Sequence, residues 1–182
     1  FAQCTAVMLA IQRLPVPVIA RVHGLATAAG CQLVGMCDLA VAGRDARFAV
    51  SGINVGLFCA TPGVALSRNV PRKAAFEMLV TGDFVSAEQA RELGLVNRVA
   101  APEALDDEVE ALVARIIAKP GVAVAMGKAL FYRQVEVGID SAYADAGATM
   151  ATNMMDPCAL EGVQAFIEKR PPEWASARAS RG

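Results

Sequence analysis

The segment from Val22 to Asp38, V-H-G-L-A-T-A-A-G-C-Q-L-V-G-M-C-D, has the residue types that could support chemistry. The β-branched run over residues 16–22 predicts a strand. The small residues that follow it predict a tight turn and then a helix, which begins within residues 26–30 and continues to Cys37. Small side chains let another molecule approach the backbone, and free amides at a helix start can hold an oxyanion. A tight turn needs small residues even without a function, so this pattern leaves both interpretations open.

The sequence offers little histidine to activate a nucleophile. His23 is the only histidine, at the end of the predicted strand, where we expect a structural hydrogen bond; a protonation switch is the alternative. With one histidine and no carboxylate near it in sequence, a Ser-His-Asp or Cys-His system is not expected.

The five cysteines argue against both a disulfide framework and a metal site. Their number is odd and no C-x-x-C pair occurs. Cys31 and Cys37 do not share a helical face well, so we expect no metal. This usage fits a reducing compartment, and we expect a cytoplasmic protein, or a mitochondrial one in a eukaryote.

Composition excludes several classes of protein. The chain has 182 residues, 55% of them hydrophobic, which excludes a disordered chain. Lys+Arg 17 against Asp+Glu 18, with no basic run, predicts no nucleic-acid partner. No window approaches the roughly 20 apolar residues that a membrane span requires, so we expect no membrane partner.

The elements that must position the Val22–Asp38 segment alternate between strands and helices. We predict strands over residues 16–22, 38–42, 48–50 and 95–99, a loop over 51–63, and helices over 1–13, 71–80 and 86–94. Thr61-Pro62 could open a further helix, with the proline at its first position. Ser86 and Gln89 form a capping box at the start of the helix over 86–94. Helices over residues 105–117, 121–137, 141–152 and 157–170 follow, the last capped by Asp156-Pro157.

This order predicts an α/β core over residues 1–101 and a helical region over 102–182. The chain begins at Phe1 inside a predicted helix without an initiator Met, so we expect residues to precede it. Trp174, in P-P-E-W, is expected to anchor the tail on the protein or on a partner.

A series of motifs covers essentially the whole chain. P-V-I-A-R-V-H-G-L-A-T-A-A-G-C-Q-L-V-G-M-C-D-L-A-V-A comes first, followed by R-F-A-V-S-G-I-N-V-G-L-F-C-A-T-P-G, E-M-L-V-T-G-D, S-A-E-Q-A-R-E-L-G-L-V and A-F-I-E-K-R. In content and order they resemble the crotonase (enoyl-CoA hydratase/isomerase) superfamily. Two stretches, G-I-N-V-G-L-F-C-A-T-P-G-V-A-L and V-P-R-K, indicate one subgroup within it. The resemblance implies a β-β-α spiral core with a C-terminal helical region that builds homotrimers, often paired into hexamers.

The resemblance also implies a ligand and a device for holding it. The ligand is an acyl-CoA thioester of fatty acid metabolism; coenzyme A is part of the substrate, and no separate cofactor is expected. Two backbone amides grip the thioester carbonyl and stabilise an enolate-like oxyanion. One comes from the turn at Ala29, where the helix opened by Gly30 begins, and the other lies upstream of Phe1.

Two positions depart from the family pattern. Hydratases carry two glutamates that bracket a water as acid and base, and here those positions are Gln32 and Gly52. Glutamine does not exchange a proton near neutral pH, and glycine has no side chain. A positioned acid or base typically contributes about 10² to 10⁴-fold in rate, so efficient hydration is not expected.

Five further residues match ligand-contacting parts of the family. Cys59 is alternatively a buried, inert thiol, Asn54 a turn residue, Phe166 a core aromatic and Lys169 a solvated surface charge. The five are Ala26, Asn54, Cys59, Phe166 and Lys169.

Three functions are consistent with this sequence. The chain is an acyl-CoA enzyme, nominally a hydratase (lyase) or isomerase; a non-catalytic acyl-CoA-binding or regulatory protein; or an oligomeric scaffold without ligand. Gln32 and Gly52 favour the second over classical hydration.

Overall fold

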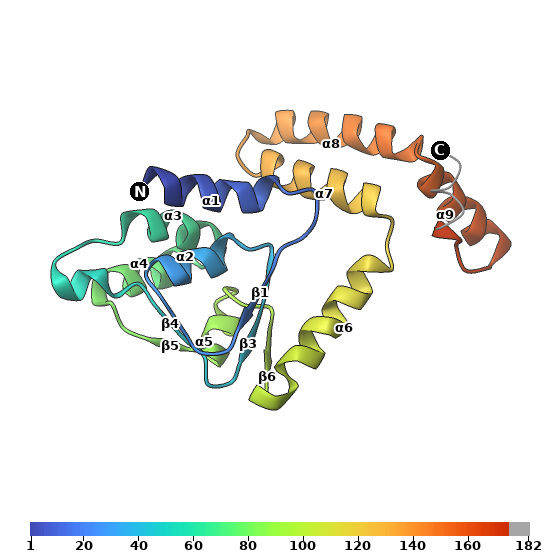
Figure 1. Cartoon of the computed structure of the whole chain (residues 1–182). Coiled ribbons are helices and arrows are strands. Elements are labelled where there is room, and N and C mark those ends of the chain that lie inside the picture. The colour runs from blue at the N-terminus through green and yellow to red at the C-terminus, as the bar shows by residue number, and fades with distance from the viewer. Residues whose placement is uncertain (175–182) are drawn as a thin grey trace. The chain divides into compact units, whose positions relative to one another are not determined.

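The computed structural model describes residues 1–174, which fall into two compact units (Figure 1). The first unit is Phe1–Val113 and the second begins at Ala114. This division lies inside helix α6 (Leu105–Ile117). The functional boundary after residue 101 stays a prediction.

The first unit contains two small sheets with helices around them (Figure 1). In one sheet, β1 (Ile19–Val22), β3 (Leu39–Gly43) and β6 (Arg98–Ala100) are parallel and pair in that order. In the other, β2 (Leu25–Thr27) pairs in parallel with β4 (Arg47–Ala49), which pairs antiparallel with β5 (Val85–Ser86). The helical elements are α1 (Ala2–Arg13), α2 (Ala29–Met36), η1 (Ser51–Val55), α3 (Ala60–Asn69), α4 (Arg72–Thr81), α5 (Ala87–Glu92) and η2 (Pro102–Ala104).

The chain winds in the expected β-β-α order. Strand β1 belongs to the first sheet and β2 to the second, and α2 follows them. Strand β3 likewise belongs to the first sheet and β4 to the second, and η1, α3 and α4 follow. Each strand pair therefore adds one strand to each sheet before the next helix. The prediction of an α/β fold is confirmed.

The start of the helix expected within residues 26–30 is confirmed, since α2 begins at Ala29. The strand before it was not predicted from the sequence: Leu25–Thr27 is β2, which pairs with β4 and places Ala26 opposite Phe48. Pairing with a distant strand outweighs the helix preference of a local alanine-rich sequence.

Several element boundaries differ from the prediction. The loop predicted over residues 51–63 contains η1, β5 was not predicted, and β6 begins at Arg98. The helix expected to open at Thr61-Pro62 is α3, which begins at Ala60. Before β6, the backbone N–H of Asn97 donates to the Ala40 carbonyl at 2.8 Å, and its Oδ1 accepts from Ala40 N at 2.7 Å. Asn97 thereby pairs with β3 like a strand residue.

The core of the first unit lies around Cys31, Phe48 and Leu66, whose side chains are fully buried. A smaller cluster joins α1 to α2 through Met8, Ile11, Met36 and Ala65. The main core contains the inner face of α2, so it fixes the helix whose first residues form the predicted site.

The second unit contains the last part of α6, then α7 (Gly121–Gln134), α8 (Ile139–Met154) and α9 (Pro157–Glu168). Arg133 of α7 forms two 3.0 Å hydrogen bonds to Asp145 of α8. The predicted Asp156 cap is confirmed, since its carboxylate accepts from Cys158 N at 2.9 Å. Within residues 1–174, no helix is both long and apolar enough to cross a membrane.

Candidate functional site

The site begins at the residue before α2. Ala28 is the N-cap of this helix, with φ 47° and ψ −115°, a backbone conformation that L-residues rarely adopt. Two hydrogen bonds fix it: Ala28 N donates to the Ala49 carbonyl at 3.0 Å, and its own carbonyl accepts from Gln32 N at 3.0 Å. The two peptide groups that flank the Ala28 Cα are therefore each fixed by one hydrogen bond.

The next two amides are available to a ligand. Ala29 and Gly30 are exposed at the first turn of α2, and no acceptor among the described residues takes their N–H groups. The first N–H groups of a helix have no partner within it, and they carry the positive end of its dipole. This turn can hold a carbonyl oxygen or an oxyanion.

Gln32 lies on the buried side of α2. Its side chain is 5% exposed, and its Oε1 lies 4.0 Å from the Cys4 Sγ, which donates to it from α1. A carboxamide in this position can hold a hydrogen bond but cannot act as a general acid or base.

Gly52 and Asn54 lie in η1, which follows β4. Because Ala49 at the end of β4 accepts from Ala28, η1 begins beside the turn that opens α2. The exposed Asn54 side chain lies against Gly82, whose φ is +69°. Asn54 therefore contacts the turn that ends α4.

Cys59 and Cys31 are both buried, and both belong to the main core. Cys59 is the N-cap of α3. Burial raises the pKa of the Cys31 thiol to about 12, and the neighbouring Cys59 contributes to the shift. Cys31 therefore stays protonated and unreactive at neutral pH.

Ala26 contributes to packing, since it is buried in the same core, opposite Phe48 on the neighbouring strand. The structure thus brings Ala26, Ala29, Gly30, Gln32, Gly52, Asn54 and Cys59 into one unit. Of these, only Ala29 and Gly30 offer free polar groups on the surface of α2.

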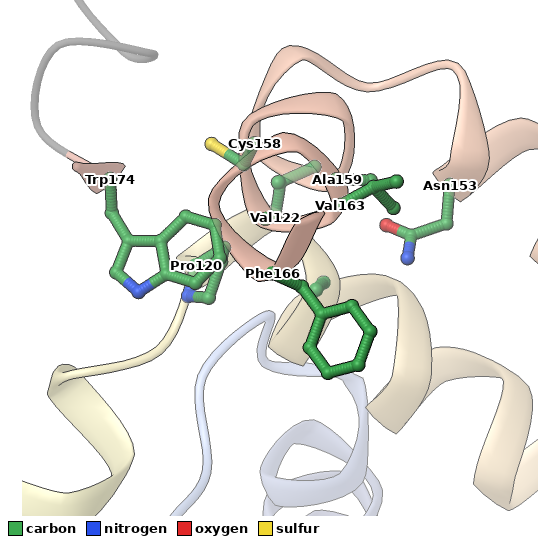
Figure 2. Close-up of a pocket in the computed structure, with 10 residues that line it drawn as sticks. Pro120, Val122, Asn153, Cys158, Ala159, Val163, Phe166 and Trp174 are labelled. Carbon is green, nitrogen blue, oxygen red and sulfur yellow. The ribbon is translucent and has the colours of Figure 1, made fainter. Parts of the chain in front are cut away.

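Phe166 and Lys169 belong to the second unit. Phe166 is 84% exposed, at the rim of an apolar pocket of about 330 Å³ that Pro120, Val122, Cys158 and Trp174 also line (Figure 2). Lys169 is exposed and ends α9 with φ 54°.

The segment after α9 folds back onto that helix. Arg170 donates to both carboxylate oxygens of Glu161, at 2.7 and 3.0 Å, and Glu173 N donates to the same carboxylate at 2.8 Å. Arg170 lowers the pKa of Glu161 to about 2. A Cβ at Gly162 would lie 2.8 Å from the Trp174 ring, so the indole packs on α9, as expected of a tail anchor.

The sequence did not reveal two features of the site. The strained conformation of Ala28 has no sequence signal, because alanine gives no sign of a positive φ. The Leu57 carbonyl, which lies against Gly52, is a backbone group and is equally invisible. A glycine at each end of the 52–56 segment was the only available hint of a tight turn.

The fold and this site define a family. The family model for enoyl-CoA hydratase/isomerase matches residues 2–177. The chain belongs to this family, the crotonases, and the predicted crotonase-like fold is confirmed.

Among curated relatives, enoyl-CoA hydratase domain-containing protein 3, mitochondrial, from Danio rerio is 49% identical over 97% of this chain and 61% of its own length. The Homo sapiens protein of that name is 46% identical over 96% of this chain and 58% of its own length. The predicted likeness to this subgroup is confirmed. The chain spans about three fifths of the length of these relatives.

Solved structures give the same result. The crystal structure of an enoyl-CoA hydratase from Mycobacterium smegmatis is 82% identical, with a TM-score of 0.95, over 96% of this chain and 68% of that one. The human enoyl-CoA hydratase domain-containing protein 3 is 47% identical, with a TM-score of 0.92, over 96% and 69% of the two chains.

Proposed function

We propose that this protein binds acyl-CoA thioesters at the start of α2 and polarises the thioester carbonyl, without efficient hydration of an enoyl group. The observation that carries the proposal is the exposed first turn of α2, where the Ala29 and Gly30 amides have no acceptor among the described residues. Family membership supports the choice of an acyl thioester as the ligand.

The Ala29 amide acts as an oxyanion donor in this proposal. Its direction is set by Ala28, whose N–H and carbonyl are both hydrogen-bonded, so little reorganisation is needed when a carbonyl arrives. One such donor is worth roughly 2.7–4 kcal/mol to a reaction that develops negative charge on that oxygen. The remaining donor of the expected pair would come from a part of the protein outside this chain.

Gln32 and Gly52 are the reason for excluding efficient hydration. Gln32 is a buried amide that contacts Cys4, and Gly52 has no side chain. Water addition to an enoyl thioester needs a group that takes a proton from the water and one that returns a proton to carbon. A binding or regulatory role, or a reaction that needs only the polarised carbonyl, is consistent with these two residues.

Family membership supports a proposal about the wider setting of the site. We propose that copies of this protein assemble as a homotrimer or hexamer, and that Phe166 and Lys169 contact the coenzyme A part of the ligand. A lysine can hold a phosphate as a point charge, and an exposed phenylalanine can cover a ring. For a eukaryotic source, the mitochondrion named for the relatives is the proposed compartment.

A pair of matched ligands tests the proposal. Protein made from its intact gene is titrated with butyryl-CoA and with S-butyl-CoA, a thioether that lacks the carbonyl. We expect butyryl-CoA to raise the unfolding midpoint and to bind about tenfold more tightly, since only the thioester accepts from the Ala29 amide. Equal binding of both ligands would remove the role of the amide. No binding of either would favour the scaffold without ligand.

A further inference from the structure

Gly52 packs closely against two residues that follow it in the chain, Leu57 and Cys59. A Cβ built on Gly52 would lie 2.6 Å from the Leu57 carbonyl oxygen and 2.7 Å from the Cys59 Sγ. Both distances are far below the contact distance of nonbonded atoms, about 3.5–4.0 Å for carbon. The volume that a side chain at residue 52 needs is therefore filled by residues 57 and 59.

The turn that brings these groups together is held by its own backbone. Leu57 N donates to the Gly52 carbonyl at 3.0 Å, and Gly56 N donates to the Ile53 carbonyl at 3.0 Å. Gly56 has a φ of +80°, in the left-handed region, which lets the chain reverse there. Cys59 then enters the core, where its side chain is 7% exposed. These two hydrogen bonds fix the position of Leu57, whose carbonyl lies beside Gly52.

A Cβ at Gly24 or at Gly30 would meet nothing within 4 Å, whereas a Cβ at Gly82 would lie 2.9 Å from the Asn54 side chain. Gly52 differs from Gly82 because the atom nearest to its Cβ belongs to the backbone. The requirement for glycine at residue 52 therefore comes from the backbone of this turn.

From this geometry we infer that Gly52 determines reaction specificity: it lets the segment 52–59 close, and the closed segment leaves no place for a second acid–base side chain at the acyl site. The inference rests on the proposed function, because it takes residue 52 to face the acyl ligand. It goes further, since it predicts that restoring glutamates at positions 32 and 52 does not restore hydration. In this inference, the loss of hydration activity is caused by the backbone of the turn and not by the absence of one side chain.

The first test measures stability and involves no ligand. In protein from the intact gene, Gly52→Ala is expected to lower the thermal midpoint by about 5 °C or more, since overpacking against backbone is costly. The matched control, Gly24→Ala, is expected to change it by no more than about 1–2 °C. An unchanged midpoint for Gly52→Ala would show that the turn opens freely and would overturn the inference.

A double variant separates the two contacts. Cys59→Ala removes the thiol but leaves the Leu57 carbonyl in place. We therefore expect Gly52→Ala to remain destabilising in the Cys59→Ala background. If Gly52→Ala no longer lowers the thermal midpoint in the Cys59→Ala background, the Cys59 side chain and not the Leu57 carbonyl excludes a side chain at residue 52. The inference is then wrong.

The second test measures hydration of crotonyl-CoA by Gln32→Glu and by the double variant Gln32→Glu/Gly52→Glu. We expect the double variant either to lose the fold that the single variant keeps, or to gain no rate over it. A folded double variant that is about 100-fold faster than Gln32→Glu would overturn the inference. Failure of the wild type to bind any acyl-CoA would refute the proposed function but would leave the stability results standing.

Discussion

At the scale of single residues, Ala28 has a backbone conformation that favours glycine, with φ 47° and ψ −115°. Such a conformation costs a non-glycine residue of order 1–3 kcal/mol and persists only where the surroundings impose it. Here the imposing contacts are the hydrogen bonds to Ala49 and Gln32. The bond from Gln32 N to the Ala28 carbonyl also fixes the peptide group that contains the Ala29 N–H, so the strained residue lies next to the proposed donor.

Ala28→Gly should relieve this strain. We expect the free energy of unfolding to rise by about 1 kcal/mol, after the entropy that glycine adds to the unfolded chain is taken into account. Thermal unfolding should show a midpoint about 2–4 °C higher. The control Ala29→Gly should lower stability slightly, since glycine is the poorer helix former. A lower midpoint for Ala28→Gly would contradict the strained conformation.

Cys31 should make the folded state sensitive to alkali. Its folded-state pKa is raised to about 12 from 9.0, so the unfolded chain loses the thiol proton first as pH rises. The stabilisation is complete below pH 9 and is lost between pH 9 and 12, at about 1.4 kcal/mol per pH unit at most. Urea unfolding at pH 8 and pH 10 should show this loss in the wild type and a smaller one in Cys31→Ala. Cys37→Ala is the control and should lose as much stability between pH 8 and pH 10 as the wild type. If it loses as little as Cys31→Ala, the alkaline loss does not belong to the Cys31 thiol.

At the scale of elements, local signals predicted caps well and pairings poorly. Ser86 and Gln89 form the predicted capping box at α5, with Ser86 Oγ accepting from Gln89 N at 3.2 Å and Gln89 Oε1 from Ser86 N at 2.8 Å. A cap lies within four residues, so the sequence contains all of it. Strands β2 and β5 depend on pairing with β4, which no local window contains, and they were not predicted.

The capping box gives an element-scale prediction. Ser86→Ala should cost about 1 kcal/mol, because it removes the acceptor for the Gln89 amide at the start of α5. The urea midpoint should fall accordingly. Ser67→Ala is the control, since that hydroxyl only donates to the Val64 carbonyl within the α3 helix. If the urea midpoint falls equally in both variants, the capping hydrogen bond of Ser86 does not stabilise the protein more than an ordinary hydroxyl within a helix.

The sequence predicted some features of the candidate site, while others depend on contacts that form only on folding. The motifs placed Ala29, Gly30, Gln32 and Gly52 by resemblance, and the structure puts all four in one unit. What the turn 52–59 does to residue 52 could not be predicted, because it depends on a backbone oxygen brought close by folding. Phe166 and Lys169 lie in the other unit, and their part in ligand binding stays a prediction.

At the scale of the whole molecule, α8 exposes an apolar stripe. Ile139, Tyr143, Met150 and Met154 lie on one helical face and are 69%, 74%, 68% and 47% exposed. Apolar side chains that gather on one surface mark interaction sites in soluble proteins. The proposed assembly of copies would cover this stripe.

Met150→Glu should therefore weaken assembly. Light scattering on protein from the intact gene should give the mass of three or six copies for the wild type and a smaller assembly for Met150→Glu, since a buried unpaired charge is costly. Ser141→Glu, at an exposed polar position of the same helix, should leave the mass unchanged. A single-copy wild type would contradict the proposed assembly.

We propose that this protein has a carbonyl-binding turn at the start of α2 but lacks the acid–base pair that hydration needs. The most direct measurement is the loss of enoyl absorbance from crotonyl-CoA with protein made from the intact gene. We predict a rate near the uncatalysed background, because Gln32 is a buried amide and Gly52 has no room for a side chain. Turnover in the ordinary enzyme range, at a kcat of roughly 1–10³ per second, would contradict the account.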